Sequence, residues 1–145
     1  MKKKINILIF GSAGYLGASL INSLPDRFSV TCFDRVICSK KDYNNQNIDK
    51  IYVSDISSKK NLKSALLHAD IVFYRAGITG GTESIDFNQA KKYIQENFEN
   101  LILVLNYAAK ANIKKFIFDS TEQIFDEFIK KNYEYDVEPD PYNFY

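Results

Sequence analysis

The sequence has no tryptophan, one histidine, one methionine and two cysteines among its 145 residues. Cys32 and Cys38 have no neighbouring residues of the kind that complete a metal site, so we expect no metal centre. Cys32 falls inside an apolar run and is best interpreted as a small core residue. This use of cysteine is typical of a reduced, cytoplasmic protein.

The sequence also lacks an excess of charge of either sign. Nineteen basic and 18 acidic residues leave a formal net charge of +1, so no overall field favours nucleic acid or a membrane surface as a partner. No apolar run approaches the length of a membrane-spanning helix. The run at 5–10 follows three lysines, but it is too short for a signal peptide and meets glycines at once. The length predicts one domain.

The first 34 residues contain the main functional pattern. Apolar residues at 5–10 predict a strand, and residues 11–17 form a glycine-rich turn, Gly-Ser-Ala-Gly-Tyr-Leu-Gly. Apolar residues at helical spacing then predict a helix that ends at Pro25. A second apolar run, 28–34, ends in Asp34. A strand, a glycine turn, a helix and a strand ending in an acidic residue together indicate a dinucleotide site.

Each residue of this pattern has a physical role if a dinucleotide lies across the turn. Gly11 can adopt backbone angles that other residues avoid, Gly14 has no side chain to block a pyrophosphate, and Gly17 lets the helix pack closely on the strand. The helix N-terminus offers unpaired N–H groups to the phosphates. Asp34 is placed to bind the adenosine ribose, although a turn-capping role is the alternative. A tight turn in another kind of α/β protein is the alternative for the whole motif.

Strands and helices alternate along the rest of the chain. Further strands are predicted at 50–53, 71–74 and 114–118, with a helix before Asp70 and a long helix at about 86–110. Ile94, Phe98, Leu101, Leu105 and Ala108 form one apolar stripe on the long helix. This alternation predicts an α/β fold: a doubly wound, Rossmann-like parallel sheet of strand order 3-2-1-4-5 in a three-layer sandwich.

Ligands of such sheets bind beyond the carboxyl ends of the strands. The candidate residues gather at that edge: Gly11 to Gly17, Asp34, Asp55, Arg75 to Gly81, Ser120 and Thr121.

With these pieces placed, the chain resembles the extended short-chain dehydrogenase/reductase family, and within it the nucleotide-sugar epimerases and dehydratases, over nearly its whole length. Asp34 matches the ribose-binding acid and implies NAD, whereas Arg35 leaves NADP possible. Asp55 and Ile56 match a pair near the adenine. The resemblance implies this cofactor-binding set: Gly11, Ala13, Gly14, Tyr15, Leu16, Gly17, Asp34, Arg35, Asp55, Ile56, Ala76, Gly77 and Asn97. A solvated surface role is the alternative for Asn97.

The resemblance also implies catalytic residues. Thr121, with Ser120 beside it, matches the catalytic Ser/Thr, and helix capping is the alternative for both. Tyr145 matches the catalytic tyrosine of a Tyr-x-x-x-Lys pair, with Tyr142 as the competing register. The chain departs from the family at two pairs of positions: Tyr74 and Arg75 replace the common His-Leu, and Asp119 and Asp126 replace the usual Ser and Gly.

The family continues beyond Tyr145 with the lysine, a sixth strand and a sugar-binding C-terminal region. We therefore expect residues 1–145 to be an NAD(P)-binding domain, the N-terminal half of an enzyme that acts on a nucleotide sugar. We expect this polypeptide to bind cofactor, to turn over a sugar poorly and to form homo-oligomers through its apolar stripe. The alternatives are a non-catalytic dinucleotide-binding module, which a lysine four residues after Tyr145 would argue against, and a flavodoxin-like domain with no affinity for NAD.

Overall fold

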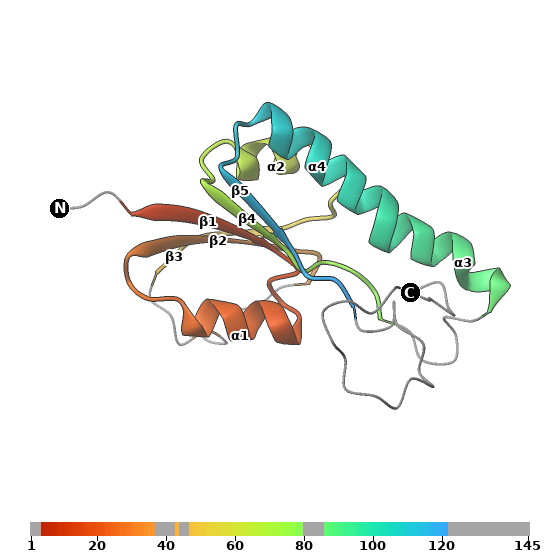
Figure 1. The fold of residues 1–145 in the computed structure, drawn as a ribbon. Helices are drawn as coiled ribbons and strands as arrows, with labels where there is room; N and C mark the ends of the chain where they lie inside the picture. The colour runs from red at the N-terminus through yellow and green to blue at the C-terminus, as the bar shows by residue number, and fades with distance from the viewer. Residues whose placement is uncertain (1–3, 37–42, 44–46, 80–85, 122–145) are drawn as a thin grey trace, which may run out of the picture.

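The computed structural model describes residues 4–36, 43, 47–79 and 86–121, which form a parallel β-sheet with helices on both faces (Figure 1). The predicted strand order is confirmed: the sheet runs β3-β2-β1-β4-β5 and every described pairing is parallel. The strands are β1 (Ile5–Phe10), β2 (Phe28–Asp34), β3 (Ile48–Val53), β4 (Ile71–Tyr74) and β5 (Lys115–Phe118).

The central strand β1 supplies apolar residues to both faces of the sheet. Ile7 and Ile9 pack in one buried cluster with Ile21 of α1 (Tyr15–Ser23). Leu8 and Phe10 belong to a second cluster, on the face covered by α2 (Lys59–Leu66) and α4 (Asn100–Lys110). Because side chains alternate along a strand, one apolar run fills both layers.

The long helix predicted at 86–110 consists of three segments: α3 (Phe87–Tyr93), a π-helical segment η3 (Ile94–Glu99), and α4. Only part of the predicted apolar stripe is buried, as the expected association through it requires. Ala108 is buried, but Ile94 is 49% and Phe98 61% exposed. The predicted spacing assumed α-helical turns throughout, whereas a π-helical turn takes in more residues and displaces those around it from that spacing. No helix among the described residues is long and apolar enough to cross a membrane.

The strand register brings the ends of four strands together. Phe10 lies opposite both Phe33 and Tyr74, and Tyr74 lies opposite Phe118. Chain order reverses beside β1, the position at which ligands of doubly wound sheets bind. The residues that follow these pairs lie together at this edge of the sheet: Gly11, Asp34, Arg75 and Asp119.

Candidate functional site

The glycine turn begins directly after β1. Gly11 has a φ of +75°, and a Cβ there would lie 2.5 Å from the carbonyl oxygen of Arg75. A Cβ on Gly17, in the first turn of α1, would lie 2.1 Å from the carbonyl oxygen of Gly11. Both expectations are confirmed: Gly11 needs a backbone conformation that side chains disfavour, and Gly17 allows close packing of the helix on the strand end.

Gly14 differs from the other two glycines. It is the N-cap of α1, with an extended backbone of φ −70° and ψ 162°, and a Cβ there would contact only the carbonyl oxygen of Gly11, at an ordinary 3.4 Å. Gly14 lines a cleft at this edge of the sheet. A side chain at this position would thus fit the fold but extend into space beside the helix N-terminus.

Asp34 closes the turn from β2. Its Oδ2 accepts a hydrogen bond of 2.8 Å from the N–H of Ala13, and its Oδ1 accepts one of 3.1 Å from the N–H of Val36. Asp34 therefore has the turn-capping role considered above and also lies against the glycine turn. Because a carboxylate can accept about four hydrogen bonds, capacity is left for a ligand hydroxyl.

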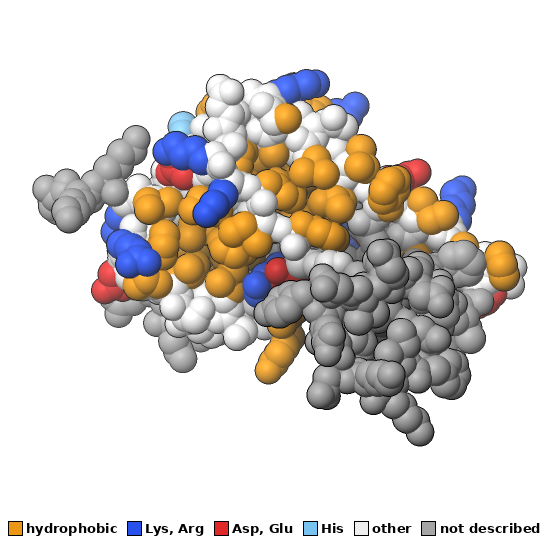
Figure 2. Space-filling view, viewed as in Figure 1, with side chains coloured by type: hydrophobic (Ala, Val, Ile, Leu, Met, Phe, Trp, Pro, Cys, Tyr) orange, Lys and Arg blue, Asp and Glu red, His pale blue; other side chains and the backbone are white. Residues whose placement is uncertain are grey.

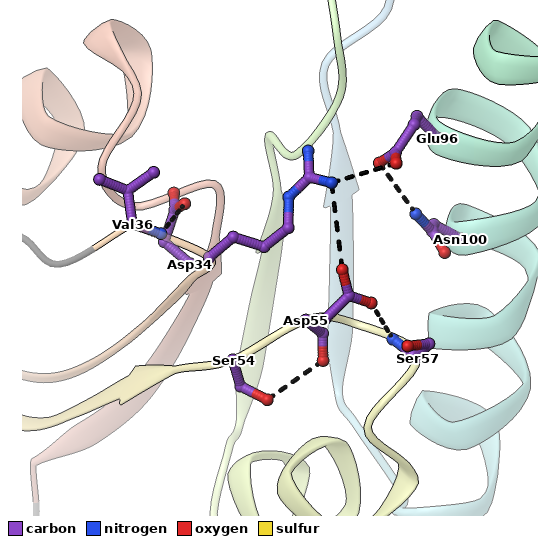
Figure 3. A network of polar contacts seen from close by, with 8 residues as sticks. Asp34, Val36, Ser54, Asp55, Ser57, Glu96 and Asn100 are labelled. Atoms are coloured by element: carbon purple, nitrogen blue, oxygen red, sulfur yellow. Dashed lines mark hydrogen bonds and ion pairs between the residues drawn. The ribbon is translucent and has the colours of Figure 1, made fainter.

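A charged network spans the cleft from β2 to the π-helical segment (Figure 3). Arg35 Nη1 lies 3.1 Å from Glu96 Oε1 and 4.0 Å from Asp55 Oδ2. The side chain of Asn100 donates to the second oxygen of Glu96 at 3.4 Å. Hydrogen bonds from the side chain and backbone N–H of Ser57, with a smaller effect from Arg35, hold the pKa of Asp55 below its ordinary value. Asp55 is thus ionised at neutral pH.

Arg75 joins three elements at the other side of the glycine turn. Its Nη1 donates to the carbonyl oxygen of Leu16 at 2.8 Å, and its Nε forms an ion pair with Asp119 Oδ2 at 2.7 Å. The guanidinium also lies 5.8 Å from the ring centroid of Phe73. Two of the departures from the family pattern are therefore partners in one ion pair, which holds the residue preceding Ser120 against the glycine turn.

Asn97 fixes the loop that leaves β4. Its Oδ1 accepts a 2.7 Å hydrogen bond from the N–H of Ile78, and its Nδ2 donates to the carbonyl oxygen of Ile78 at 3.0 Å. The side chain is half-buried rather than freely solvated. A Cβ on Gly77 would approach Asn97 Oδ1 to 3.0 Å, so a small residue at position 77 lets the amide reach the loop.

Tyr74, the residue before Arg75, is fully buried. Burial raises the pKa of its phenol, and the negative charge of Glu96 raises it further. Tyr74 therefore stays protonated at physiological pH and is not a proton acceptor for this site.

The cleft has a volume of about 320 Å³. It brings together most of the predicted cofactor-binding residues: Gly11, Ala13, Gly14, Asp34, Arg35, Asp55, Ile56, Ala76 and Gly77. Tyr15, Leu16, Gly17 and Asn97 do not line it, and neither do Ser120 and Thr121, which follow β5. Tyr145 and Tyr142 lie outside the described residues. Within the described ranges, no group of three or more His, Cys, Asp or Glu side chains could hold a metal ion.

The prediction did not include Glu96 and Asn100, which also line the cleft. Glu96 precedes the predicted Asn97 directly, so its position next to a candidate residue was the available signal. The spacing of apolar residues did not predict the π-helical segment in which Glu96 lies.

Comparison with solved structures places the fold. The UDP-N-acetylglucosamine 4-epimerase of Methanobrevibacter ruminantium M1, in complex with UDP-N-acetylmuramic acid, superposes with a TM-score of 0.84 at 23% identity, over 99% of this chain and 46% of its own. The UDP-glucuronic acid 4-epimerase of Bacillus cereus, with UDP-glucuronic acid and NAD, gives 0.82 at 22%, over 97% and 47%. The chain spans less than half the length of these proteins.

A search of curated proteins finds no match. The sequence does match a family of known proteins over residues 7–145, almost its whole length. The chain therefore belongs to the NAD dependent epimerase/dehydratase family.

Proposed function

We propose that this chain is the NAD-binding half of a nucleotide-sugar epimerase or dehydratase. The observation that carries the proposal is the cleft beyond the carboxyl ends of β1, β2 and β4, where Gly14 leaves space beside a helix N-terminus and Asp34 faces the same turn. The family membership and the NAD bound in the Bacillus cereus epimerase support it.

The residues present fit a dinucleotide. The N-terminus of α1 would hold the pyrophosphate, since its first N–H groups have no partners within the helix. Asp34 would accept hydrogen bonds from the adenosine ribose, and Asp55 with Ile56 would border the adenine. Ala76 and Gly77, small residues in the loop held by Asn97, would leave room for the nicotinamide ribose. The bound cofactor would supply the hydride acceptor.

The acid–base part of the reaction falls to the residues that follow β5. In the intact enzyme, the hydroxyl of Thr121, or of Ser120, would hold the substrate oxygen, and Tyr145 would take its proton. A phenol with an ordinary pKa near 10 needs positive charge nearby to do this at neutral pH. We propose that residues 1–145 by themselves bind cofactor without turning over a sugar, because they span less than half the length of the epimerases with which they superpose.

Isothermal calorimetry with NAD tests the binding proposal. We expect one NAD per chain, and a chain that is folded by circular dichroism but gives no saturable heat would refute it. A hydride-transfer assay with a UDP-sugar, followed by reduced-nicotinamide absorbance, tests the second proposal. Turnover of a UDP-sugar by residues 1–145 alone would contradict it.

We also propose that the chain self-associates through the exposed side of its long helix. Ile94, Phe98, Ile102 and Leu105 are all exposed there, and Figure 2 shows apolar side chains following this helix. Apolar surface of this kind favours association. Sedimentation should show that Phe98→Glu shifts the chain to monomer, whereas Leu67→Glu, at an exposed leucine directly after α2, does not. A wild-type chain that sediments as a monomer would contradict this.

A further inference from the structure

The two arginines that line the cleft already have carboxylate partners. Arg75 is paired with Asp119 at 2.7 Å. Arg35 lies 3.1 Å from Glu96 and 4.0 Å from Asp55, and so bridges β2, the end of β3 and the π-helical segment (Figure 3). Guanidinium groups are the side chains best suited to bind phosphate. In this cleft, both would have to leave or share a carboxylate in order to do so.

Of the two partners of Arg35, Glu96 is the stronger. The distance is shorter, and the side chain of Glu96 is 22% exposed against 49% for Asp55, so solvent screens its charge less. The second carboxylate oxygen of Glu96 accepts from Asn100, which limits the orientations of the group. Glu96 is therefore the residue that holds Arg35 in place across the cleft.

We propose that Glu96 is a specificity-determining residue that keeps Arg35 from receiving a 2′-phosphate and thereby makes the cleft selective for NAD over NADP. This rests on the proposed function, which puts the adenosine ribose beside Asp34. The residue next to a ribose-binding acid is where an arginine can accommodate the 2′-phosphate of NADP. Here that arginine is Arg35, and it is already paired with Glu96. To bind a 2′-phosphate, Arg35 would have to leave the negative charge of Glu96.

The acidic residues around the expected position of the ribose also disfavour a 2′-phosphate. Asp34 is held by the N–H groups of Ala13 and Val36, so it cannot swing away from an incoming phosphate without breaking two hydrogen bonds. The charged residues that line the cleft include three acids, Asp34, Asp55 and Glu96. A 2′-phosphate would bring close to two further negative charges into this group.

The test measures dissociation constants for NAD and NADP by calorimetry and compares their ratio among variants. Glu96→Gln removes the charge but keeps the shape of the side chain. We expect it to lower the ratio Kd(NADP)/Kd(NAD) about tenfold, the order of magnitude for removing one partly screened charge near a phosphate. Glu99→Gln makes the same change in net charge at an exposed position of the same segment that does not line the cleft, and should leave the ratio unchanged.

Arg35→Gln identifies the mechanism. Combined with Glu96→Gln, it should restore the high ratio, because the gain depends on a released arginine. If Arg35→Gln in the presence of Glu96 already raises the ratio tenfold, Arg35 is available to phosphate and the inference is wrong. An unchanged ratio in Glu96→Gln, with NAD still bound, overturns this inference alone. Absence of binding of either nucleotide to every folded variant overturns the proposed function together with it.

Discussion

Replacing Gly17 by alanine should destabilise the fold, whereas the same change at Gly14 should act on binding. A Cβ on Gly17 would lie 2.1 Å from the carbonyl oxygen of Gly11 and 2.9 Å from Cα of Ser12. Both atoms belong to the backbone, so no rotation of a side chain relieves the contact. The first turn of α1 must move away from the end of β1.

The expected loss follows from two opposing effects. Overpacking at a rigid site costs about 3 kcal/mol at the upper end of its usual range. Alanine is better than glycine inside a helix by up to about 1 kcal/mol. The net destabilisation is therefore about 2 kcal/mol, which for a chain of this length lowers Tm by roughly 7 °C.

Gly14→Ala is the matched control from the same turn. The extended backbone at Gly14 suits alanine, and the nearest contact of a Cβ would be an ordinary 3.4 Å, so we expect a stability loss of no more than about 1 kcal/mol. Its new methyl group would instead occupy the cleft and weaken NAD binding. Thermal unfolding followed by circular dichroism, with calorimetry on the folded proteins, separates the two effects. Equal losses of stability, or wild-type affinity in Gly14→Ala, would refute the reasoning.

Two further predictions concern the loop after β4 and the acid limb of stability. Asn97→Ala removes both hydrogen bonds to Ile78. Amide hydrogen exchange at Ile78 should become faster, and the free energy of unfolding should fall by about 1–2 kcal/mol. Unchanged exchange would show that the loop keeps its conformation without Asn97. Hydrogen bonds from Ser57 are the main reason that the pKa of Asp55 lies below its ordinary value of 3.8. The ionised carboxylate therefore contributes fully to stability above pH 3.8, and this contribution is lost as the pH falls through the lowered pKa of the folded state. Denaturant titrations from pH 5 to pH 2 should therefore show a shallower acid decline in Asp55→Asn than in wild type, and parallel curves would argue against the assignment.

The sequence was sufficient for those parts of the site that depend on near neighbours. The requirements on Gly11 and Gly17 arise within one turn, and the alternation of strands and helices placed Asp34 at the correct edge of the sheet. The partners of Arg35 could not be predicted from the sequence, because the Arg35–Glu96 pair joins residues 61 positions apart. Their contact depends on the actual path of the helix, and apolar spacing gave no sign of the π-helical segment.

That segment has a consequence for the number of residues in the long helix. Tyr93 is buried, but it is not part of either core cluster of the described residues, whereas Val104 and Ala108 belong to the cluster beneath α2. The π-helical segment lies between these buried residues, so its wider turn sets how they are rotated about the helix axis relative to one another. Deleting one residue from Ile94–Glu99 and restoring α-helical turns would rotate α3 relative to α4 by about 100°. Helix length here is thus constrained as tightly as strand register, unlike the length of a surface loop.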